Sequence, residues 1–575
     1  MNPTLKSIPI LADDEPRSRR HAAAQLKGRQ VDTAALQAVR TLIGEAPPDG
    51  HRRDLLIEYL HRLNDHYLGL FERHLVALAS EMRLGVAEVF EVASFYHHFE
   101  ILKDGDTPAA VTLRVCQGQT CAMAGAPALQ QRLLGLLGSG VRVLEAPCIG
   151  RCDQAPAVLL GQRAMGHATE ADLIEALNGP VQPAQQSWVA PEFVAYCEYR
   201  EAGGYGTAAA IVNSEEDPED IFRALEDSGL RGLGGAGFPA ARKWRIVRDQ
   251  PGPRALAVNI DEGEPGTFKD RYYLERDPHR FLEGMLIAAQ LAGTENCYLY
   301  LRDEYHDLRR MLRRELDALL ADPPCPLPNI ELRRGAGAYV CGEESAMIES
   351  IEGKRGEPRL RPPYVAQVGL FGQPTLEHNL ETLHWVRDIL EKGPAWFASA
   401  GRHGRKGLRS FSVSGRVKNP GVKLAPAGIT LRELVDEYCG GMAEGHTLYA
   451  YLPGGASGGI LPARLADLAL DFDTLQPYGC FIGSAAVVVL SQRDRARDAA
   501  LNAMRFFADE SCGQCTPCRV GTVKAAALME APVWDLAALN DLSAVMADAS
   551  ICGLGQAAPN PLRCVQQYFS HEIGL

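Results

Sequence analysis

The stretch SGLRGLGGAGFPAARKW, residues 228–244, decides what kind of α/β fold this chain can adopt. Its residues Gly232, Gly234 and Gly237 match the dinucleotide-binding pattern G-x-G-x-x-G. That pattern marks an ordinary Rossmann site only where a β-strand precedes it, and the preceding DIFRALEDSG is helical in character. We therefore do not expect an ordinary Rossmann site here. The glycines still indicate close approach of the backbone to a phosphate or a ring, with Lys243 near enough to add positive charge.

Two acidic loops accompany the glycine stretch. AVNIDEGEPGTFKDR (257–271) ends a predicted strand, and GAGAYVCGEES (335–345) combines glycines with a tyrosine and two glutamates. Carboxylates beside a phosphate-binding loop are costly unless they accept hydrogen bonds from sugar hydroxyls or ring N–H groups. Flavin and nicotinamide nucleotides supply both. A general acid–base pair, as in a hydrolase, is the alternative, but no Ser/His/Asp or metal–histidine arrangement accompanies these carboxylates.

A cysteine motif near the C-terminus predicts an iron–sulfur cluster. ESCGQCTPCRVG (510–521) places Cys512, Cys515 and Cys518 around one turn, as three corners of a [4Fe–4S] cube require. A remote fourth cysteine would complete the set. Cys552 is the natural candidate, because the Gly and Pro residues of SICGLGQAAPNP fix a turn around it, and Cys564 in a helical setting is the rival.

A second set of cysteines lies in the first third of the chain. The spacing is Cys116-x4-Cys121 and Cys148-x3-Cys152, with each pair where a predicted strand ends. Four thiolates can hold a [2Fe–2S] cluster or one zinc ion. Structural zinc loops more often use two-residue spacers, so the spacing favours [2Fe–2S] and leaves zinc as the alternative. Two clusters in one chain indicate electron transfer.

Composition narrows the class of protein further. The chain has 575 residues, a formal net charge of −13 and 46% hydrophobic residues, which predicts several globular domains and no nucleic-acid partner. No apolar run reaches the roughly 20 residues that cross a bilayer, and the first 20 residues lack the apolar core of a secretory signal. We expect a cytoplasmic protein with no membrane contact, whose 15 cysteines do not form a disulfide framework.

Residues 190–575 resemble the flavin-bearing, NADH-oxidising subunit of respiratory complex I and its soluble relatives. The resemblance is carried by the glycine stretch, both acidic loops, EHNLETL (377–383) and both C-terminal cysteine stretches. Residues of about 30–178 resemble the thioredoxin-like [2Fe–2S] subunit that docks beside it, through VASFYHHF (92–99) and the four cysteines. The chain is thus similar to a fusion of the two subunits.

The resemblance implies FMN, NAD, a [2Fe–2S] cluster and a [4Fe–4S] cluster as cofactors, with the following residues. FMN would be held by Gly232, Gly234, Gly235, Gly237, Lys243, Asn259, Asp261, Tyr339, Gly342, Glu343, Glu344, His378 and Asn379. NAD(H) would face Phe238, Glu264, Arg361 and Tyr364, and Glu262 of the same acidic loop joins the cofactor-binding candidates. The clusters would be held by Cys116, Cys121, Cys148 and Cys152 and by Cys512, Cys515, Cys518 and Cys552. Acidic Glu264 and Glu344 would repel the 2′-phosphate of NADP.

The implied fold class is a multidomain α/β protein. Its expected parts are an N-terminal extension (1–30), a helical bundle plus thioredoxin-like ferredoxin domain (31–178), a linker (179–190), a Rossmann-like α/β FMN/NAD-binding domain (191–405), a ubiquitin-like SLBB domain (406–492) and a helical bundle with the [4Fe–4S] cluster (493–575).

GLGGAGFP, HNLETL and CGLGQAAPNP are similar to the diaphorase subunit of NAD-dependent formate dehydrogenases. This resemblance implies a large molybdenum- or tungsten-pterin catalytic partner with further iron–sulfur clusters, and electrons that pass between those clusters and NAD through FMN. Leu233 stands where many relatives have Arg, and His378 where the respiratory enzymes have a second Asn. The alternatives are a diaphorase of an NAD-reducing hydrogenase, a complex I module and, from another class, a zinc-stapled scaffold with a degenerate nucleotide site.

Overall fold

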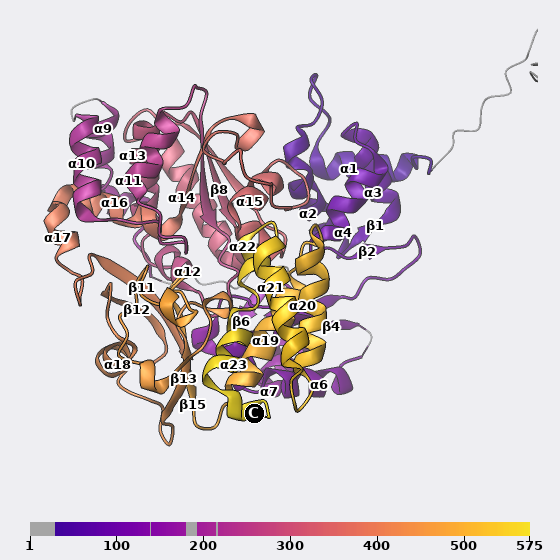
Figure 1. Cartoon of the computed structure of the whole chain (residues 1–575). Helices are drawn as coiled ribbons and strands as arrows, with labels where there is room; N and C mark the ends of the chain where they lie inside the picture. Colours follow the sequence, from indigo (N-terminus) through magenta and orange to yellow (C-terminus); the bar gives the residue numbers. More distant parts are fainter. Residues whose placement is uncertain (1–28, 139, 180–191, 214–216, 575) are drawn as a thin grey trace, which may run out of the picture.

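The computed structural model describes residues 29–138, 140–179, 192–213 and 217–574 (Figure 1). The predicted N-terminal extension and linker lie outside the described residues, apart from residues 29, 30 and 179. The rest forms an N-terminal helical bundle, a small ferredoxin-like domain, a large α/β domain, a second β-rich domain and a C-terminal helical bundle, which confirms the predicted fold class. No helix in the described ranges is long and apolar enough to span a bilayer.

The N-terminal bundle forms because its helices share an apolar face. Its helices are α1 (Thr33–Ile43), α2 (Leu56–Tyr67), α3 (Glu72–Glu81) and α4 (Val86–Phe95). Asp32 caps α1 by accepting hydrogen bonds from the amides of Ala34 and Ala35. Short parallel strands β1 (Leu70–Phe71) and β2 (Ile101–Leu102) close the bundle.

The ferredoxin-like domain has a four-stranded sheet of order β4-β3-β5-β6. Its elements are β3 (Val111–Cys116), α5 (Gln119–Met123), α6 (Ala126–Leu136), β4 (Val141–Ala146), β5 (Val158–Leu160), β6 (Arg163–Met165) and α7 (Glu170–Asn178). Strands β3 and β4 pair in parallel through the α6 crossover, as the strand–helix–strand pattern predicts. The domain has a hydrophobic core of its own.

The large α/β domain is built on a parallel sheet of order β10-β7-β8-β9. The strands are β7 (Ala255–Ile260), β8 (Asn296–Leu301), β9 (Asn329–Arg334) and β10 (Thr375–Asn379). The helices are α8 (Tyr196–Glu201), α9 (Gly206–Val212), α10 (Pro218–Ser228), α11 (Ala240–Arg248), α12 (Lys269–Leu274), α13 (Pro278–Ala292), α14 (His306–Ala321), α15 (Glu344–Ile351), α16 (Leu380–Lys392) and α17 (Pro394–Ala398). Strands β7 and β8 are almost wholly buried, as expected where helices cover a parallel sheet. The glycine loop follows α10, the helix expected from DIFRALEDSG.

The β-rich domain and the C-terminal bundle complete the chain. The β-rich sheet has the order β12-β11-β15-β13-β14, with strands β11 (Leu408–Gly415), β12 (Gly421–Pro426), β13 (Leu448–Leu452), β14 (Leu461–Pro462) and β15 (Ala486–Ser491). Its short helix α18 (Leu431–Glu433) runs into a π-helical turn. The bundle consists of α19 (Ala496–Asp509), α20 (Thr516–Met529), α21 (Leu536–Ala549), α22 (Gly553–Ala557) and α23 (Asn560–Tyr568).

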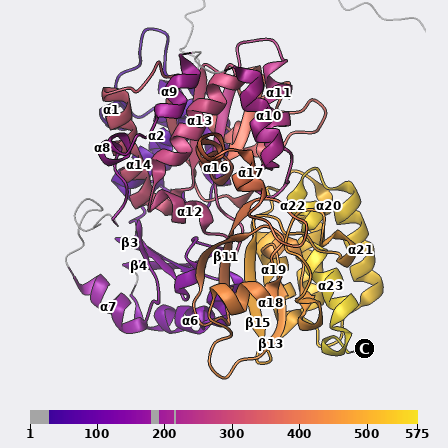
Figure 2. The same ribbon diagram turned by 90° about the vertical axis from the view of Figure 1, so that its left-hand side faces the viewer.

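Figure 2 shows how these parts meet. The large α/β domain lies above, while the ferredoxin-like domain and the yellow C-terminal bundle lie below it, with β11 between them. One continuous hydrophobic core joins the N-terminal bundle, the α/β domain, the β-rich domain and the C-terminal bundle. The ferredoxin-like domain is therefore the part whose apolar core stands apart from this common core.

Candidate electron-transfer site

The glycine loop packs against the first turn of α16. A Cβ at Gly234 would lie 2.9 Å from the Cβ of Asn379, and Gly237 has a φ of +66°. The amide of Leu233 donates to Thr382 Oγ1 at 2.8 Å. Asn379 caps α16 by accepting from the amide of Glu381. The loop thus lies beside the positive end of a 13-residue helix, an arrangement that favours a phosphate.

Two carboxylates at the carboxyl ends of neighbouring strands each have an oxygen without a hydrogen-bond partner among the described residues. They are Asp261, directly after β7, and Glu377 in β10. Burial raises the pKa of Asp261 to about 8. Burial, with the nearby charge of Glu344, raises the pKa of Glu377 to about 8. The side-chain amide of Asn259 lies between them and donates to Gly342 O at 2.9 Å.

These features fit FMN. The ribityl hydroxyls and ring N–H of FMN are donors of the kind that Asp261 Oδ2 and Glu377 Oε2 lack. Lys243 forms an ion pair with Glu344 at 3.2 Å, and Arg361 pairs with Glu343. Glu343 also caps α15. The aromatic rings of Phe238 and Tyr364 stand 41% and 55% exposed, so both are open to stacking.

His378 and Asn379 are engaged with protein partners. Trp244 Nε1 donates to His378 Nε2 at 2.5 Å, and burial lowers the pKa of His378 well below its ordinary value, which keeps the imidazole neutral. Asn379 Oδ1 accepts from Lys269 Nζ at 2.8 Å, and its Nδ2 donates to Asp270 at 2.6 Å. The two side chains hold the end of β10 in place. Glu377, which lies within EHNLETL but is not among the predicted site residues, supplies the free oxygen there.

Glu262 and Glu264 point to different surroundings although they are two residues apart. Glu262 accepts hydrogen bonds from the amide of Asp270 at 2.8 Å and the hydroxyl of Tyr305 at 2.8 Å. Glu264 accepts from Ser457 and from the hydroxyl of Tyr339. The structure thus brings together Glu264 and Tyr339, which the sequence assigned to different cofactors.

The four cysteines of the ferredoxin-like domain form one buried group. Cys148 Sγ lies 3.7 Å from Cys152 Sγ, and Cys116 is within hydrogen-bonding reach of Cys121 and Cys148. The neighbouring thiols, together with burial, raise the pKa of Cys116 and of Cys152 well above the ordinary value. Hydrogen bonds from Cys116 and Cys152 instead lower the pKa of Cys148 well below the ordinary value. A cation among the four sulfurs would let all of them bind as thiolates, and iron supplies it, so this donor set fits a [2Fe–2S] cluster.

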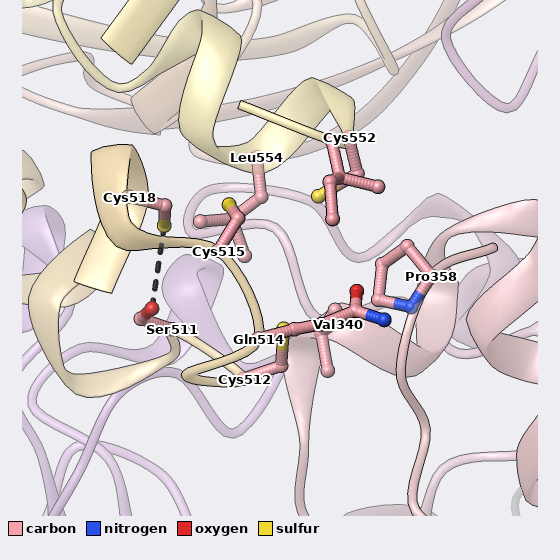
Figure 3. Close-up of a pocket in the computed structure, with 10 residues that line it drawn as sticks. Val340, Pro358, Ser511, Cys512, Gln514, Cys515, Cys518, Cys552 and Leu554 are labelled. Carbon is pink, nitrogen blue, oxygen red and sulfur yellow. Dashed lines mark hydrogen bonds between the residues drawn. The ribbon is translucent and has the colours of Figure 1, made fainter. Parts of the chain in front are cut away.

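The second four-cysteine group lines a cavity between the C-terminal bundle and the α/β domain, drawn in Figure 3. Cys512, Cys515, Cys518 and Cys552 surround it together with apolar Val340, Pro358, Ile551 and Leu554. Burial raises the pKa of Cys518 to about 11 and that of Cys552 to about 12. Sulfur donors in an apolar pocket fit a [4Fe–4S] cluster.

Two other cysteines have surroundings that bear on the sequence-based predictions. Cys564, the rival fourth ligand, does not line this cavity; its Sγ lies 3.5 Å from Cys480 Sγ. Cys197 lies outside both four-cysteine groups and is exposed.

Residues between the sites were not predicted from the sequence. Arg302 donates to Cys148 O at 2.6 Å and to Glu262 O, so it joins the ferredoxin-like cysteine loop to the acidic loop. Glu510 accepts from the amide of Tyr339 at 2.8 Å, which joins the second acidic loop to the cysteine loop of the bundle. His98 Nδ1 lies 2.6 Å from Asp303 Oδ2, within hydrogen-bond distance. Of these linking residues, only Glu510 could have been singled out from the sequence, because it directly precedes the cysteine motif SCGQC.

The parallel sheet with its acidic loops and the two four-cysteine groups define an iron–sulfur flavoprotein of the electron-transfer class. Comparison with known families agrees over most of the chain. The matching family descriptions are Thioredoxin-like [2Fe-2S] ferredoxin (39–179), Nuo51 FMN-binding domain (225–388), SLBB domain (410–461) and NADH-ubiquinone oxidoreductase-F iron-sulfur binding region (498–574).

Individual relatives place the chain more closely. It is 40% identical over 388 residues to the second F-type subunit of the NADH-quinone oxidoreductase of Rhizobium meliloti (strain 1021), covering 65% of this chain and 92% of the relative. It is 39% identical over 372 residues to the mitochondrial NADH dehydrogenase [ubiquinone] flavoprotein 1 of Dictyostelium discoideum, covering 61% of this chain and 78% of the relative. A solved chain of an NAD+-reducing [NiFe]-hydrogenase in the H2-reduced state is 34% identical, with a TM-score of 0.79 over 91% of this chain and 92% of that one.

The chain belongs to the family of the FMN-binding, F-type subunits of NADH-quinone oxidoreductases, and it carries in addition a thioredoxin-like [2Fe–2S] ferredoxin domain. It is an NADH-binding flavin and iron–sulfur electron-transfer protein of multi-subunit type. The four predicted cofactors, FMN, NAD, [2Fe–2S] and [4Fe–4S], are confirmed.

Proposed function

We propose that this chain is the diaphorase subunit of an NAD-linked oxidoreductase complex, in which it exchanges electrons between NAD(H) and the clusters of a catalytic partner. One observation carries this role: the unpartnered oxygens of Asp261 and Glu377 lie in the same molecule as two separate four-cysteine groups. A nucleotide site alone would need no clusters, and the clusters alone would need no acidic loops.

The proposed site residues act by binding and orienting. Gly232, Gly234 and Gly235 with the first turn of α16 would hold the FMN phosphate. Asn259, Asp261 and Glu377 would accept from its hydroxyls or ring N–H, in a site from which burial excludes water. FMN, when bound, supplies the conversion between two-electron exchange with NAD(H) and one-electron exchange with clusters.

The NAD(H) contacts are proposed for a second group of residues. Phe238 and Tyr364 offer exposed rings, Arg361 offers a cation for phosphates, and Glu264 offers a carboxylate for a hydrogen-bond donor of the dinucleotide. The four C-terminal cysteines would hold the cluster that passes electrons on.

The test of the proposed diaphorase role is anaerobic purification with measurement of flavin, iron and NADH-dependent reduction of ferricyanide. A protein that lacks flavin and turnover would contradict the role.

The proposed catalytic partner is a molybdenum- or tungsten-pterin formate dehydrogenase subunit with further iron–sulfur clusters. The support is the likeness of GLGGAGFP, HNLETL and CGLGQAAPNP to diaphorases of such enzymes. A cytoplasmic location belongs to the same proposal and is consistent with 15 free cysteines.

An NAD-reducing hydrogenase is the second candidate. A specific observation favours it, because the hydrogenase chain matches 91% of this chain across the fused domains. A complex I module, favoured by the relatives from Rhizobium meliloti and Dictyostelium discoideum, is the third. Metal analysis of the native complex isolated through this chain separates them: molybdenum or tungsten supports the formate dehydrogenase, nickel supports the hydrogenase, and iron alone contradicts the formate dehydrogenase and points to a complex I module or an iron-only hydrogenase.

A further inference from the structure

A loop of the SLBB domain reaches into the α/β domain and holds Glu264. The loop connects β13 to β14. The main-chain N–H of Ser457 donates to Glu264 Oε1 at 2.8 Å, and the Ser457 hydroxyl donates to the same oxygen at 2.7 Å. The hydroxyl of Tyr339 donates to Oε2. Both carboxylate oxygens are therefore fixed, from two sides and by two different domains.

The loop is itself held close to the carboxylate. Gly455 has a φ of +77°, and a Cβ added there would lie 2.7 Å from Glu264 Cγ, so only glycine allows this approach. The amide of Gly455 donates to Ala486 O of β15 at 2.8 Å. Asn560, the first residue of α23, donates from Nδ2 to Ser457 O at 3.0 Å. The loop that holds Glu264 is thus itself fixed by β15 and by α23.

This arrangement leaves Glu264 able to accept further hydrogen bonds. An ionised carboxylate has about four acceptor positions, and the protein donors described above occupy three of them. Burial acts against the charged form of Glu264, while the donors from Tyr339 and Ser457 favour it. Removing the Ser457 hydroxyl would take away one of these donors and leave only the Ser457 N–H and the Tyr339 hydroxyl to hold the carboxylate in its orientation.

We propose that Ser457 is a positioning residue for NAD(H): it fixes the orientation in which the Glu264 carboxylate accepts a hydrogen bond from the dinucleotide. The SLBB domain thereby contributes to the nucleotide site. This inference rests on the proposed function, which assigns Glu264 to NAD(H). Ser457 itself touches Glu264 and acts through it.

The test compares S457A with S457T and T267A in the full chain, purified with flavin and clusters. Loss of a hydrogen bond to a charged group is expected to raise the KM for NADH about tenfold in S457A, with kcat for ferricyanide reduction almost unchanged. S457T keeps a hydroxyl and restores the wild-type KM. T267A removes a 2.7 Å contact between Thr267 and Ser484 at the same domain seam and leaves the KM unchanged.

Three results would overturn the inference: an unchanged KM in S457A, an equal rise in S457A and T267A, or failure of S457T to restore the KM. If S457A loses its flavin, N560A is measured in its place. This variant removes the hydrogen bond to Ser457 O that holds the loop and leaves both Ser457 donors to Glu264 in the chain. A raised KM in N560A supports the inference and an unchanged one overturns it. Turnover by the wild-type protein is measured first, since its absence from flavin-loaded protein would contradict the proposed function and not Ser457 alone.

Discussion

At the residue scale, the chemistry of the site rests on groups that the fold keeps from their usual ionisation state. Spacing in the sequence singled out seven cysteines, the Gly and Pro residues around Cys552 suggested the eighth, and the resemblance pointed to Asp261 and Glu264. Sequence could not identify Ser457, because its contact with Glu264 joins residues 193 positions apart. The contact of Glu510 with Tyr339 joins residues 171 positions apart. Such pairs follow only from tertiary packing.

The raised pKa values of Asp261 and Glu377 predict a stability that depends on pH. Both pKa values are about 8 in the folded protein, above those of the unfolded chain, so the folded state retains protons that the unfolded state loses. The groups that face Glu377 are Glu343, Glu344 and Lys243. The Tm of the flavin-free protein should therefore fall as pH rises from about 5 to about 8, and E377Q should flatten this fall.

Thermal melts across this pH range, with E45Q at an exposed position as the matched control, measure the effect. A Tm that rises with pH, or an equal slope in E377Q and wild type, would show that these carboxyls are ionised in the folded protein.

A second residue-scale prediction concerns the fourth ligand of the C-terminal cluster. C552A should lose the iron and the electron paramagnetic resonance signal of one cluster, because Cys552 lines the cavity with the other three cysteines. C564A should keep both, since Cys564 lies against Cys480 instead. Iron content per chain and spectra of the reduced protein give the answer; the reverse result would make Cys564 the ligand.

At the element scale, the order of helix and strand around the glycine loop was predictable. The helix α10 before the loop and the strand β7 before the acidic loop both follow from their apolar patterns. Strand β6 and helix α5 could not be predicted from the sequence. They have only three and five residues, which is too short for a hydrophobic period to show. The π-helical turn after α18 has no signal in the sequence.

The contact between the glycine loop and α16 predicts a selective effect of adding one methyl group. G234A would place a Cβ 2.9 Å from Asn379 Cβ, whereas G206A at the start of α9 would meet nothing within 4 Å. Overpacking of this kind costs about 1–3 kcal/mol of the free energy of unfolding. We expect G234A to be destabilised and to bind FMN more weakly, with G206A near wild type in both. Denaturant unfolding and flavin fluorescence test this, and equal behaviour of the two variants would contradict it.

At the scale of the whole molecule, buried arginines and a small apolar cluster of Cys148, Cys152 and Phe268 join the ferredoxin-like domain to the rest. Arg302 links Cys148 O to the acidic loop, and Arg271 donates to Gly150 O at 2.8 Å and to Asp153 at 2.8 Å. The separate core of this domain was predictable from its own strands and helix. The orientation of this domain on the rest of the chain was not predictable from the sequence. It depends on contacts with buried Arg271 and Arg302, which lie more than 100 positions from Gly150 and Cys148 in the sequence.

Removing Arg302 should loosen this docking. R302A leaves Glu304 without its 2.8 Å ion pair and Cys148 O without its donor, and breaking a buried pair typically costs about 3–5 kcal/mol. We expect faster hydrogen exchange over residues 148–153 and a changed [2Fe–2S] spectrum, with the [4Fe–4S] spectrum unaltered. R505A, which removes an exposed ion pair with Glu530, is the control. Unchanged exchange in R302A would show that other contacts fix the domain.

The proposed function requires that NADH deliver electrons through this one chain to its clusters. The most direct measurement is anaerobic titration of the purified, flavin-loaded protein with NADH, followed by optical absorbance and electron paramagnetic resonance. We expect NADH to bleach the flavin absorbance and to produce the signal of at least one reduced iron–sulfur cluster, with both changes weakened at low NADH in S457A. Flavin and iron present in full, with no change in either spectrum on addition of NADH, would contradict it.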